Sequence, residues 1–137
     1  MAALLSHEAI IVDERDNYSN TPLIWAAHNG HTDIATMLCG RGADVNAVGK
    51  DSDTPLIYAA QKGHTDIATM LCGRGADVNA VNQDSNTPLI FAAYNGHTDI
   101  ATMLCGRGAD VNAVNKDSDT PLIYAACKGH TDIAALL

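Results

Sequence analysis

The sequence predicts an all-α repeat solenoid, built of stacked helix-turn-helix units with short projecting hairpin-like fingers and no extended sheet. The phrase Thr-Pro-Leu-Ile returns four times, and the residues between successive copies repeat almost unchanged. A fixed period of about 20 to 50 residues indicates an array, and one such unit cannot bury its apolar face alone. The phrases begin 33 residues apart, at Thr21, Thr54, Thr87 and Thr120.

The first helix of each unit is defined most clearly in the second repeat. Thr54 can cap the helix with its hydroxyl, and Pro55 suits the first helical position because its missing N–H costs nothing there. Leu56 with Ala59 and Ala60, at i, i+3 and i+4, forms a short apolar face. A glycine after this segment is expected to end the helix.

The second helix and the finger complete the unit. His64 or Thr65 is expected to cap this helix, and Asp66 in its first turn is favoured by the helix dipole. Residues 76–81 then run out as a short extended arm, and the polar stretch 82–86 turns the chain into the next Thr-Pro. The expected buried face of the second helix comprises Ile67, Ala68, Leu71 and Cys72.

This pattern closely resembles the ankyrin repeat over nearly the whole chain. The residues that carry the resemblance are Thr-Pro-Leu-x-x-Ala-Ala, Gly-His, and Gly-Ala-Asp-Val-Asn-Ala at 42–47, 75–80 and 108–113. The resemblance implies a curved solenoid whose fingers border a concave inner groove. It also implies protein–protein recognition without catalysis.

Two repeated positions depart from the family pattern. The family usually has His after Thr-Pro-Leu, where this chain has Ile, so we expect a drier contact without the usual hydrogen bonding. The family also usually has Gly two residues before the Thr. Ser stands there instead and tolerates positive φ poorly, which leaves the turn type of the finger open. The departures are Ile24, Ile57, Ile90 and Ile123, and Ser19, Ser52, Ser85 and Ser118.

We expect one ankyrin-repeat domain over 1–137. Its first part, 1–15, is predicted to be a degenerate half-repeat or cap, because Ala3-Leu4-Leu5 matches Thr36-Met37-Leu38 at the repeat offset. Both ends of the chain stop at the same phase, which favours a segment cut from a longer array. An uncapped last repeat also suggests weak end-to-end self-association. Full repeats are expected at 16–48, 49–81 and 82–114, and a truncated one at 115–137.

Charge and composition narrow the classes of partner. A formal charge of −8 disfavours nucleic acid and anionic membrane, and it leaves a basic protein partner open. Cys39, Cys72 and Cys105 occupy equivalent positions on helices expected about 8–10 Å apart, whereas a disulfide needs Cα atoms within roughly 7 Å. We therefore expect reduced cysteines and a cytoplasmic protein.

No enzymatic, metal or cofactor site is predicted. His31, His64, His97 and His130 recur once per repeat, but helix spacing prevents them from sharing one metal ion. A catalytic centre is normally unique, whereas every nucleophile, acid or base here belongs to the repeated framework.

The repeats differ from one another at residues on two surfaces. We predict that these residues bind the partner. Trp25, His28 and Asn29 mark the first surface, at i, i+3 and i+4 on the first helix. The equivalent positions in later repeats are Tyr58, Gln61, Lys62, Phe91, Tyr94, Asn95, Tyr124, Cys127 and Lys128. The second surface is the finger tip, with Lys50, Asp53, Gln83, Asn86, Lys116 and Asp119. Its charged residues either steer a basic partner or serve as solvated turn residues.

Two interpretations stay open for the aromatic positions. Trp25, Tyr58, Phe91 and Tyr124 either form a ladder of anchors for a partner or pack beneath the neighbouring finger. We expect a protein-interaction module within a larger scaffold or effector. One alternative is an engineered or consensus-like scaffold without a natural partner. Another, implied by the resemblance, is a substrate of an asparaginyl hydroxylase, with its sites at Asn46, Asn79 and Asn112.

Overall fold

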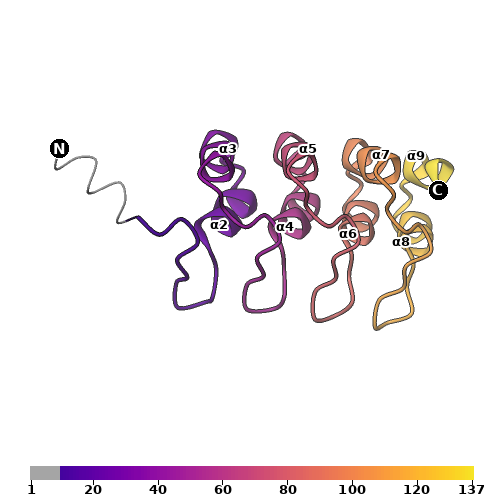
Figure 1. Cartoon of the computed structure of the whole chain (residues 1–137). Coiled ribbons are helices and arrows are strands. Elements are labelled where there is room, and N and C mark those ends of the chain that lie inside the picture. The colour runs from indigo at the N-terminus through magenta and orange to yellow at the C-terminus, as the bar shows by residue number, and fades with distance from the viewer. Residues whose placement is uncertain (1–9) are drawn as a thin grey trace, which may run out of the picture.

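Residues 10–137 are described by the computed structural model of this chain. This range holds eight α-helices and no strand: α2 (Pro22–Asn29), α3 (Thr32–Gly40), α4 (Pro55–Lys62), α5 (Thr65–Gly73), α6 (Pro88–Asn95), α7 (Thr98–Gly106), α8 (Pro121–Lys128) and α9 (Thr131–Leu136). The inner helices α2, α4, α6 and α8 form the layer beside the projecting loops, and the outer helices α3, α5, α7 and α9 form the other layer (Figure 1). The predicted all-α repeat solenoid is confirmed.

Every inner helix begins and ends in the predicted way. In α4, the Thr54 hydroxyl accepts a hydrogen bond from the backbone N–H of Ile57 at 3.2 Å, and Pro55 is the first helical residue. The helix ends at Gly63, whose φ of 81° lies in the left-handed region that glycine adopts without steric cost. The same threonine cap begins α2, α6 and α8.

The outer helices differ from the prediction at their first residue. His64 occupies the cap position of α5, but its side chain makes no hydrogen bond to its own helix. The imidazole instead reaches the preceding repeat, where Nε2 lies 3.2 Å from the carbonyl oxygen of His28. Carbonyls in the last turn of a helix lack an internal partner, so this contact satisfies one of them. His97 and His130 contact the carbonyls of Gln61 and Tyr94 in the same way, both at 3.1 Å.

The core is a continuous row of small and branched side chains between the two layers. Each inner helix packs on the next inner helix, and each outer helix packs on the next outer helix. The alanines of the inner helices are fully or almost fully buried up to Ala93, which allows neighbouring backbones to approach closely. Ile24, Ile57 and Ile90 are also buried, in keeping with the dry contact expected after Thr-Pro-Leu.

Three of the four cysteines belong to this packing. All four are free; Cys39 and Cys72 are buried and Cys105 is partly buried. Burial raises the pKa of each of these three thiols, which favours the neutral form. They therefore act as small apolar side chains. Cys127 is exposed on α8.

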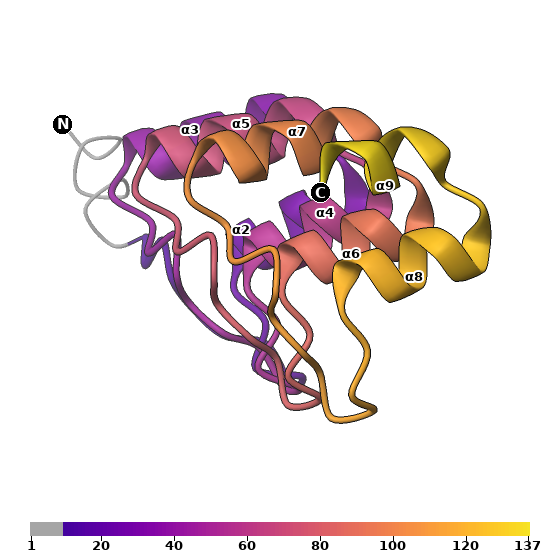
Figure 2. The same ribbon diagram turned by 90° about the vertical axis from the view of Figure 1, so that its right-hand side faces the viewer.

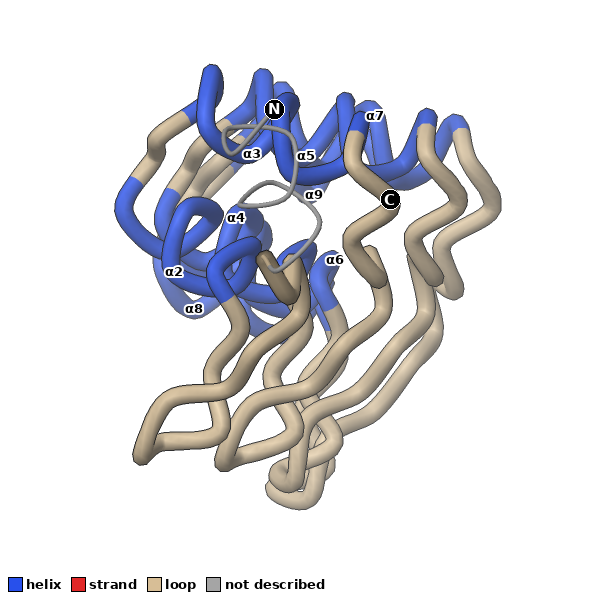
Figure 3. Tube along the Cα trace, turned by 60° about the vertical axis from the view of Figure 1, so that its left-hand side comes forward, coloured by secondary structure: helices blue, strands red, loops and turns tan. Residues whose placement is uncertain are grey.

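The fingers project together to one side of the helical layers (Figures 2 and 3). Each tip is closed by a backbone hydrogen bond, such as the one from Asn82 N to Asn86 O at 3.1 Å. The turn type left open by the sequence is now defined, because the serines adopt the left-handed conformation. The φ values are 63° at Ser19, 64° at Ser52, 62° at Ser85 and 64° at Ser118.

The last repeat exposes side chains that are buried in the internal repeats. Leu122 and Ile123 are 48% and 46% exposed, whereas the equivalent Leu56 and Ile57 are buried beneath the following repeat. The predicted half-repeat segment at residues 3–5 lies outside the described residues. Within them, Val12 packs against the core at the first end of the row.

Candidate protein-interaction surface

The predicted partner-binding residues lie on the inner helices and at the finger tips, and we call this set of positions the inner face. It comprises the variable side chains of the inner helices together with the finger tips. Trp25 and Tyr94 are 40% and 41% exposed, respectively, although both are large and aromatic. The other exposed members are Asn29, Lys50, Lys62, Gln83, Asn95, Lys116, Cys127 and Lys128, and the partly buried ones are His28, Asp53, Tyr58, Gln61, Asn86, Phe91, Asp119 and Tyr124.

Two aromatic side chains of the inner helices contact the finger of their own repeat. The indole N–H of Trp25 donates to Oδ2 of Asp16 at 2.7 Å. The Tyr124 hydroxyl accepts from Nδ2 of Asn115 at 3.0 Å. Each side chain is thus held at its polar edge by the finger of its own repeat, whereas the packing interpretation placed it beneath the neighbouring finger. The role of these rings as anchors for a partner stays a prediction. Asp16 and Asn115 belong to this surface although neither is among the residues predicted from the sequence.

The ring contacts form two groups. In the first aromatic cluster, His28 lies edge-on between Trp25 and Tyr58, with centroid distances of 5.9 Å and 5.0 Å. In the second aromatic cluster, Tyr94 and Tyr124 lie 5.1 Å apart at 82°. Both clusters join side chains of two successive repeats, so they also order the inner helices relative to each other.

Amide side chains connect one finger to the next. Oδ1 of Asn82 accepts the backbone N–H groups of Asp84 at 3.0 Å and Asn86 at 3.1 Å, which shapes its own turn. Its Nδ2 donates across to Asp53 at 3.0 Å. Backbone bonds such as the one from Gln83 N to Asp51 O, also 3.0 Å, reinforce the contact. The finger tips therefore form a connected edge.

This connection is interrupted at the second finger. Gly49 occupies the position that corresponds to Asn82, and it has no side-chain amide that could donate a hydrogen bond. Oδ1 of Asn20, which would accept from such an amide, is buried without a hydrogen-bond partner. The Asn20 oxygen lies where a side chain at position 49 would begin, because a Cβ added to Gly49 would stand 2.2 Å from it.

The finger side of the inner face is acidic. Burial, together with the nearby Asp51 and Asp84 carboxylates, raises the pKa of Asp53, although the hydrogen bond from Asn82 opposes this. Burial, and then the charges of Asp53 and Asp51, raise the pKa of Tyr58. The hydrogen bond from Trp25 instead lowers the pKa of Asp16. Asp51 and Asp84 therefore add negative charge beside Asp53, on a finger edge that also carries Lys50 and Lys116.

Asparagines at the base of the fingers join consecutive repeats. Oδ1 of Asn46 accepts the N–H of Asp77 at 2.8 Å, and its Nδ2 donates to the Gly75 carbonyl at 3.3 Å. Asn79 makes the same pair of bonds to the third repeat. Asp13 accepts from the N–H of Asp44 at 3.1 Å, an equivalent place one repeat earlier. The two asparagines thus join repeats through both atoms of the amide.

Comparison with known families identifies the architecture. A model described as ankyrin repeats in three copies matches residues 56–137, and a second one, for ankyrin repeats in many copies, matches residues 4–59. The chain belongs to the ankyrin-repeat family. Ankyrin repeats are in general protein–protein interaction modules, and the family is a non-enzymatic type.

Relatives match single stretches of the chain. Ankyrin repeat domain-containing protein 49 of Bos taurus, like that of Homo sapiens, is 51% identical over 45 residues, covering 33% of this chain and 19% of that protein. Alpha-latrotoxin-Lt1a of Latrodectus tredecimguttatus is 42% identical over 48 residues, 35% of this chain and 3% of that protein. The chain therefore spans less than a fifth of the length of these relatives.

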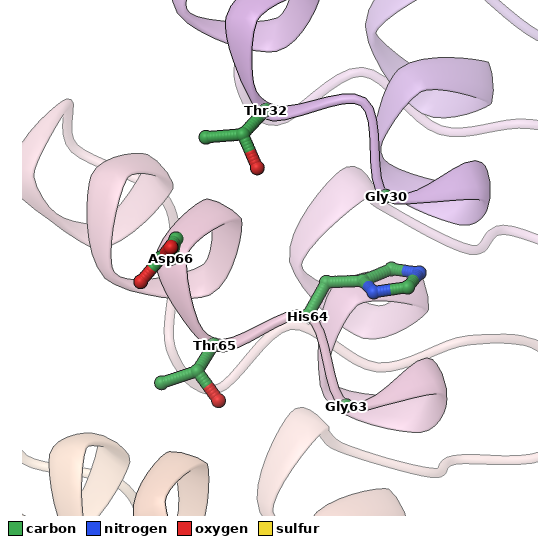
Figure 4. Close-up of a pocket in the computed structure, with 6 residues that line it drawn as sticks. All are labelled: Gly30, Thr32, Gly63, His64, Thr65 and Asp66. Atoms are coloured by element: carbon green, nitrogen blue, oxygen red, sulfur yellow. The ribbon is translucent and has the colours of Figure 1, made fainter.

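The hollows between the ankyrin repeats are small and repeat with the architecture. Figure 4 shows one of about 270 Å³ where the helix-connecting turns of two repeats meet, lined by Gly30, Thr32, Gly63, His64, Thr65 and Asp66. Equivalent hollows follow at Thr65–Asp99 and Thr98–Asp132. In the described part of the chain, no three His, Cys, Asp or Glu side chains are placed to hold a metal ion, and no helix is long and apolar enough to cross a membrane.

Proposed function

We propose that this ankyrin-repeat domain binds a protein partner through the groove bordered by its inner helices and finger tips, as part of a larger scaffold or effector. The observation that carries the proposal is where the repeats differ. The outer helices α3, α5 and α7 share one sequence, whereas the inner helices differ at their exposed positions. Stability alone would not require different side chains at those positions in each repeat.

The chemistry of the variable positions also supports binding. Aromatic side chains dominate the energetics of protein interfaces. Trp25 and Tyr94 keep about two-fifths of their surface exposed, and hydrogen bonding or ring contacts limit the freedom of both. Such partly fixed rings lose little conformational entropy when a partner covers them.

Partner capture with matched variants tests the proposal. The full chain is used as bait in a lysate of the cells that make it, beside Trp25→Ala, Tyr94→Ala and, as a control on an outer helix end, Arg74→Ala. The aromatic variants should lose about 2 kcal/mol or more of binding free energy each, as central interface aromatics do. A partner retained equally by all three variants would place recognition elsewhere. Circular dichroism verifies that each variant is folded.

Two alternative functions remain as proposals. Identical outer helices favour an engineered or consensus-like scaffold without a natural partner, while the free cysteines oppose it, because designs avoid an exposed one. The exposure of Asn46, Asn79 and Asn112 favours the second alternative, that the chain is a substrate of an asparaginyl hydroxylase. Intact-mass measurement of protein from its own cell distinguishes this second case, through a gain of one oxygen per modified site.

End-to-end self-association is supported by Leu122 and Ile123, which are half exposed on the last repeat. A second molecule could cover this surface as the next repeat covers Leu56. Light scattering over a wide concentration range should show weak association that Leu122→Gln removes, and a strict monomer refutes it. We also propose a cytoplasmic location, supported by the free cysteines; thiol labelling in the source cell tests this.

A further inference from the structure

We infer that the inner face binds lysine or arginine side chains of an extended partner segment at the first, second and fourth repeats, where an aromatic ring and a carboxylate occur together. The pairs are Trp25 with Asp16, Tyr58 with Asp53, and Tyr124 with Asp119. This inference rests on the proposed function and specifies the chemistry of the partner. It predicts a spacing of basic residues as well as their charge.

An aromatic ring and a carboxylate occur together in the first two repeats. Trp25 donates to Asp16, and Asp53 lies close enough to Tyr58 for its charge to raise the pKa of the hydroxyl, so each carboxylate lies near the ring of its own repeat. A cation over an aromatic face gains from the ring quadrupole, and it gains again from a carboxylate at the ring edge. An amino or guanidinium group is the partner chemistry that uses both features.

The chain itself provides an example of the contact. Lys128 places its Nζ 4.6 Å from the centroid of the Tyr94 ring, in the second aromatic cluster. That amino group reaches back from α8 to the ring on the preceding inner helix. The second cluster therefore already has a cation on one of its rings, whereas Trp25 in the first cluster is 40% exposed beside an acidic side chain.

Charge favours the same occupant. The carboxyl groups of Asp51, Asp53 and Asp84 lie close enough for the first and third to affect the ionisation of the second. Asp51 and Asp53 likewise act on the Tyr58 hydroxyl. The whole chain carries a formal charge of −8, so the approach of a basic segment is favoured over long distances as well.

The repeat spacing determines the pattern in the partner. Neighbouring helices are about 8–10 Å apart, and an extended chain advances about 3.3 Å per residue, so successive repeats meet every third partner residue. In the first repeat the ring of Trp25 bonds to Asp16, and in the second and fourth repeats Asp53 and Asp119 occupy the same position, five residues before Tyr58 and Tyr124. Phe91 in the third repeat has the neutral Asn86 at the position of Asp53. The expected segment carries basic residues at positions 1, 4 and 10 and an apolar one at position 7.

Synthetic peptides test this pattern directly. A ten-residue peptide with Arg at 1, 4 and 10 and Leu at 7 on a Ser/Gly background is titrated into the full chain, together with the same sequence reversed. Trp25 is the single tryptophan, so its fluorescence reports on the site. We expect saturable binding that weakens as salt is added, and at least tenfold weaker binding of the peptide with Gln in place of Arg.

The chain offers a matched pair of variants for the carboxylates. Asp53→Asn introduces the residue found at position 86, and Asn86→Asp introduces the residue found at position 53, so both changes occur naturally in the repeat. The first should weaken peptide binding about two- to fivefold, the range for a surface ion pair. The second should strengthen binding of a peptide with Arg at position 7 by a similar factor.

The inference is overturned if neither peptide direction binds at millimolar concentration, if Gln for Arg leaves the affinity unchanged, or if Asp53→Asn has no effect. A control peptide with its three arginines at positions 1 to 3 must also bind more weakly. Equal affinity of the two peptides would mean that only general charge attraction holds them. These failures differ from failure of the proposed function. Suppose that a captured partner depends on Trp25 and Tyr94 but has no basic segment. That result would support binding in the groove and would contradict the preference for basic side chains.

Discussion

The side-chain nitrogen of Asn82 donates to a carboxylate oxygen of Asp53 in the preceding finger, 3.0 Å away. Asn115 makes the equivalent bond to Asn86 at 2.8 Å. The first such joint is incomplete because Gly49 has no side chain, and Oδ1 of Asn20 is left buried and unpaired. An internal comparison of the repeats thus identifies one repairable defect.

Replacing Gly49 with Asn should stabilise the protein. The side chain of Asn20 would have to move away from position 49. The new side-chain amide would then donate a hydrogen bond to the Asn20 oxygen. A hydrogen bond contributes about 0.5–1.5 kcal/mol, and removing a loop glycine at negative φ adds a few tenths more. We expect a gain of about 1–2 kcal/mol in the free energy of unfolding, measured by urea denaturation.

The control for this prediction is Gly49→Ala. Its Cβ would crowd the same Asn20 oxygen at 2.2 Å and offers no donor. The alanine variant should therefore be no more stable than the parent. Equal stability of the Asn and Ala variants would show that the missing amide is not the defect.

Relieving the strained serines should stabilise the fingers. Ser52 and Ser85 hold φ values of 64° and 62°, which cost an L-residue about 1–2 kcal/mol and glycine almost nothing. Glycine also raises the conformational entropy of the unfolded chain, which offsets part of this benefit. We therefore expect a net gain of about 0.5 kcal/mol in the free energy of unfolding per Ser→Gly change. Chemical denaturation of the single and double variants measures the gain. Because the two turns are in contact through Gln83 and Asp51, a modest departure from additivity is tolerated, but a loss of stability contradicts the prediction.

Removing the imidazole of His97 should loosen one joint of the solenoid. Its Nε2 lies 3.1 Å from the carbonyl of the partly buried Gln61, and a carbonyl left unpaired costs about 1–3 kcal/mol when it is buried. His97→Ala should lose that much in urea unfolding. His31→Ala provides the comparison, since His31 occupies the same helix position but is exposed; its loss should stay within about 0.5 kcal/mol. Similar losses for both variants would reject the role of the joint.

Asp53 and Asp16 should give opposite pH dependences of stability. Burial first, and nearby carboxylates, raise the folded-state pKa of Asp53 above 3.8, so its folded form binds the proton more tightly than the unfolded form. Stability then falls as pH rises through the window above 3.8. Asp53→Asn should remove this cost, by no more than about 1 kcal/mol for a half-exposed group, and the gain should vanish below that window.

Asp16 behaves in the reverse sense. The hydrogen bond from Trp25 lowers its folded-state pKa below 3.8, so its contribution is present above that value and is lost as pH falls through the lower pKa. Asp16→Asn should therefore reduce stability at neutral pH, whereas Asp53→Asn raises it. Unfolding curves at pH 3, 5 and 7 compare the two. A shift of the same sign for both variants at pH 7 would contradict the assignment.

The repeated elements could be predicted from the sequence because their signals are local. Thr54 and Pro55 define the start of a helix within two residues, and Leu56 fits the apolar spacing that follows. The structure bears out these elements and the burial of the core. The positive φ of Ser52 could have been inferred too, from the glycine usual at that position in the family.

The contacts between repeats could not be predicted in the same way. His64 pairs with a carbonyl 36 residues earlier, and this depends on how two units are oriented in space. The Trp25–Asp16 bond likewise depends on the finger folding back towards its own helix. The defect at Gly49 did leave a signal, since the aligned repeats have Asn at positions 82 and 115, but its consequence for Asn20 required the structure.

The bonds of Asn46 to the second repeat and of Asn79 to the third are the same in atoms and nearly the same in length. A deletion or duplication of 33 codons would therefore bring together ends that already match. Unequal recombination in the gene could shorten or extend the array without any new contact having to evolve. The number of side chains that a partner must offer would change by whole steps, one for each unit gained or lost.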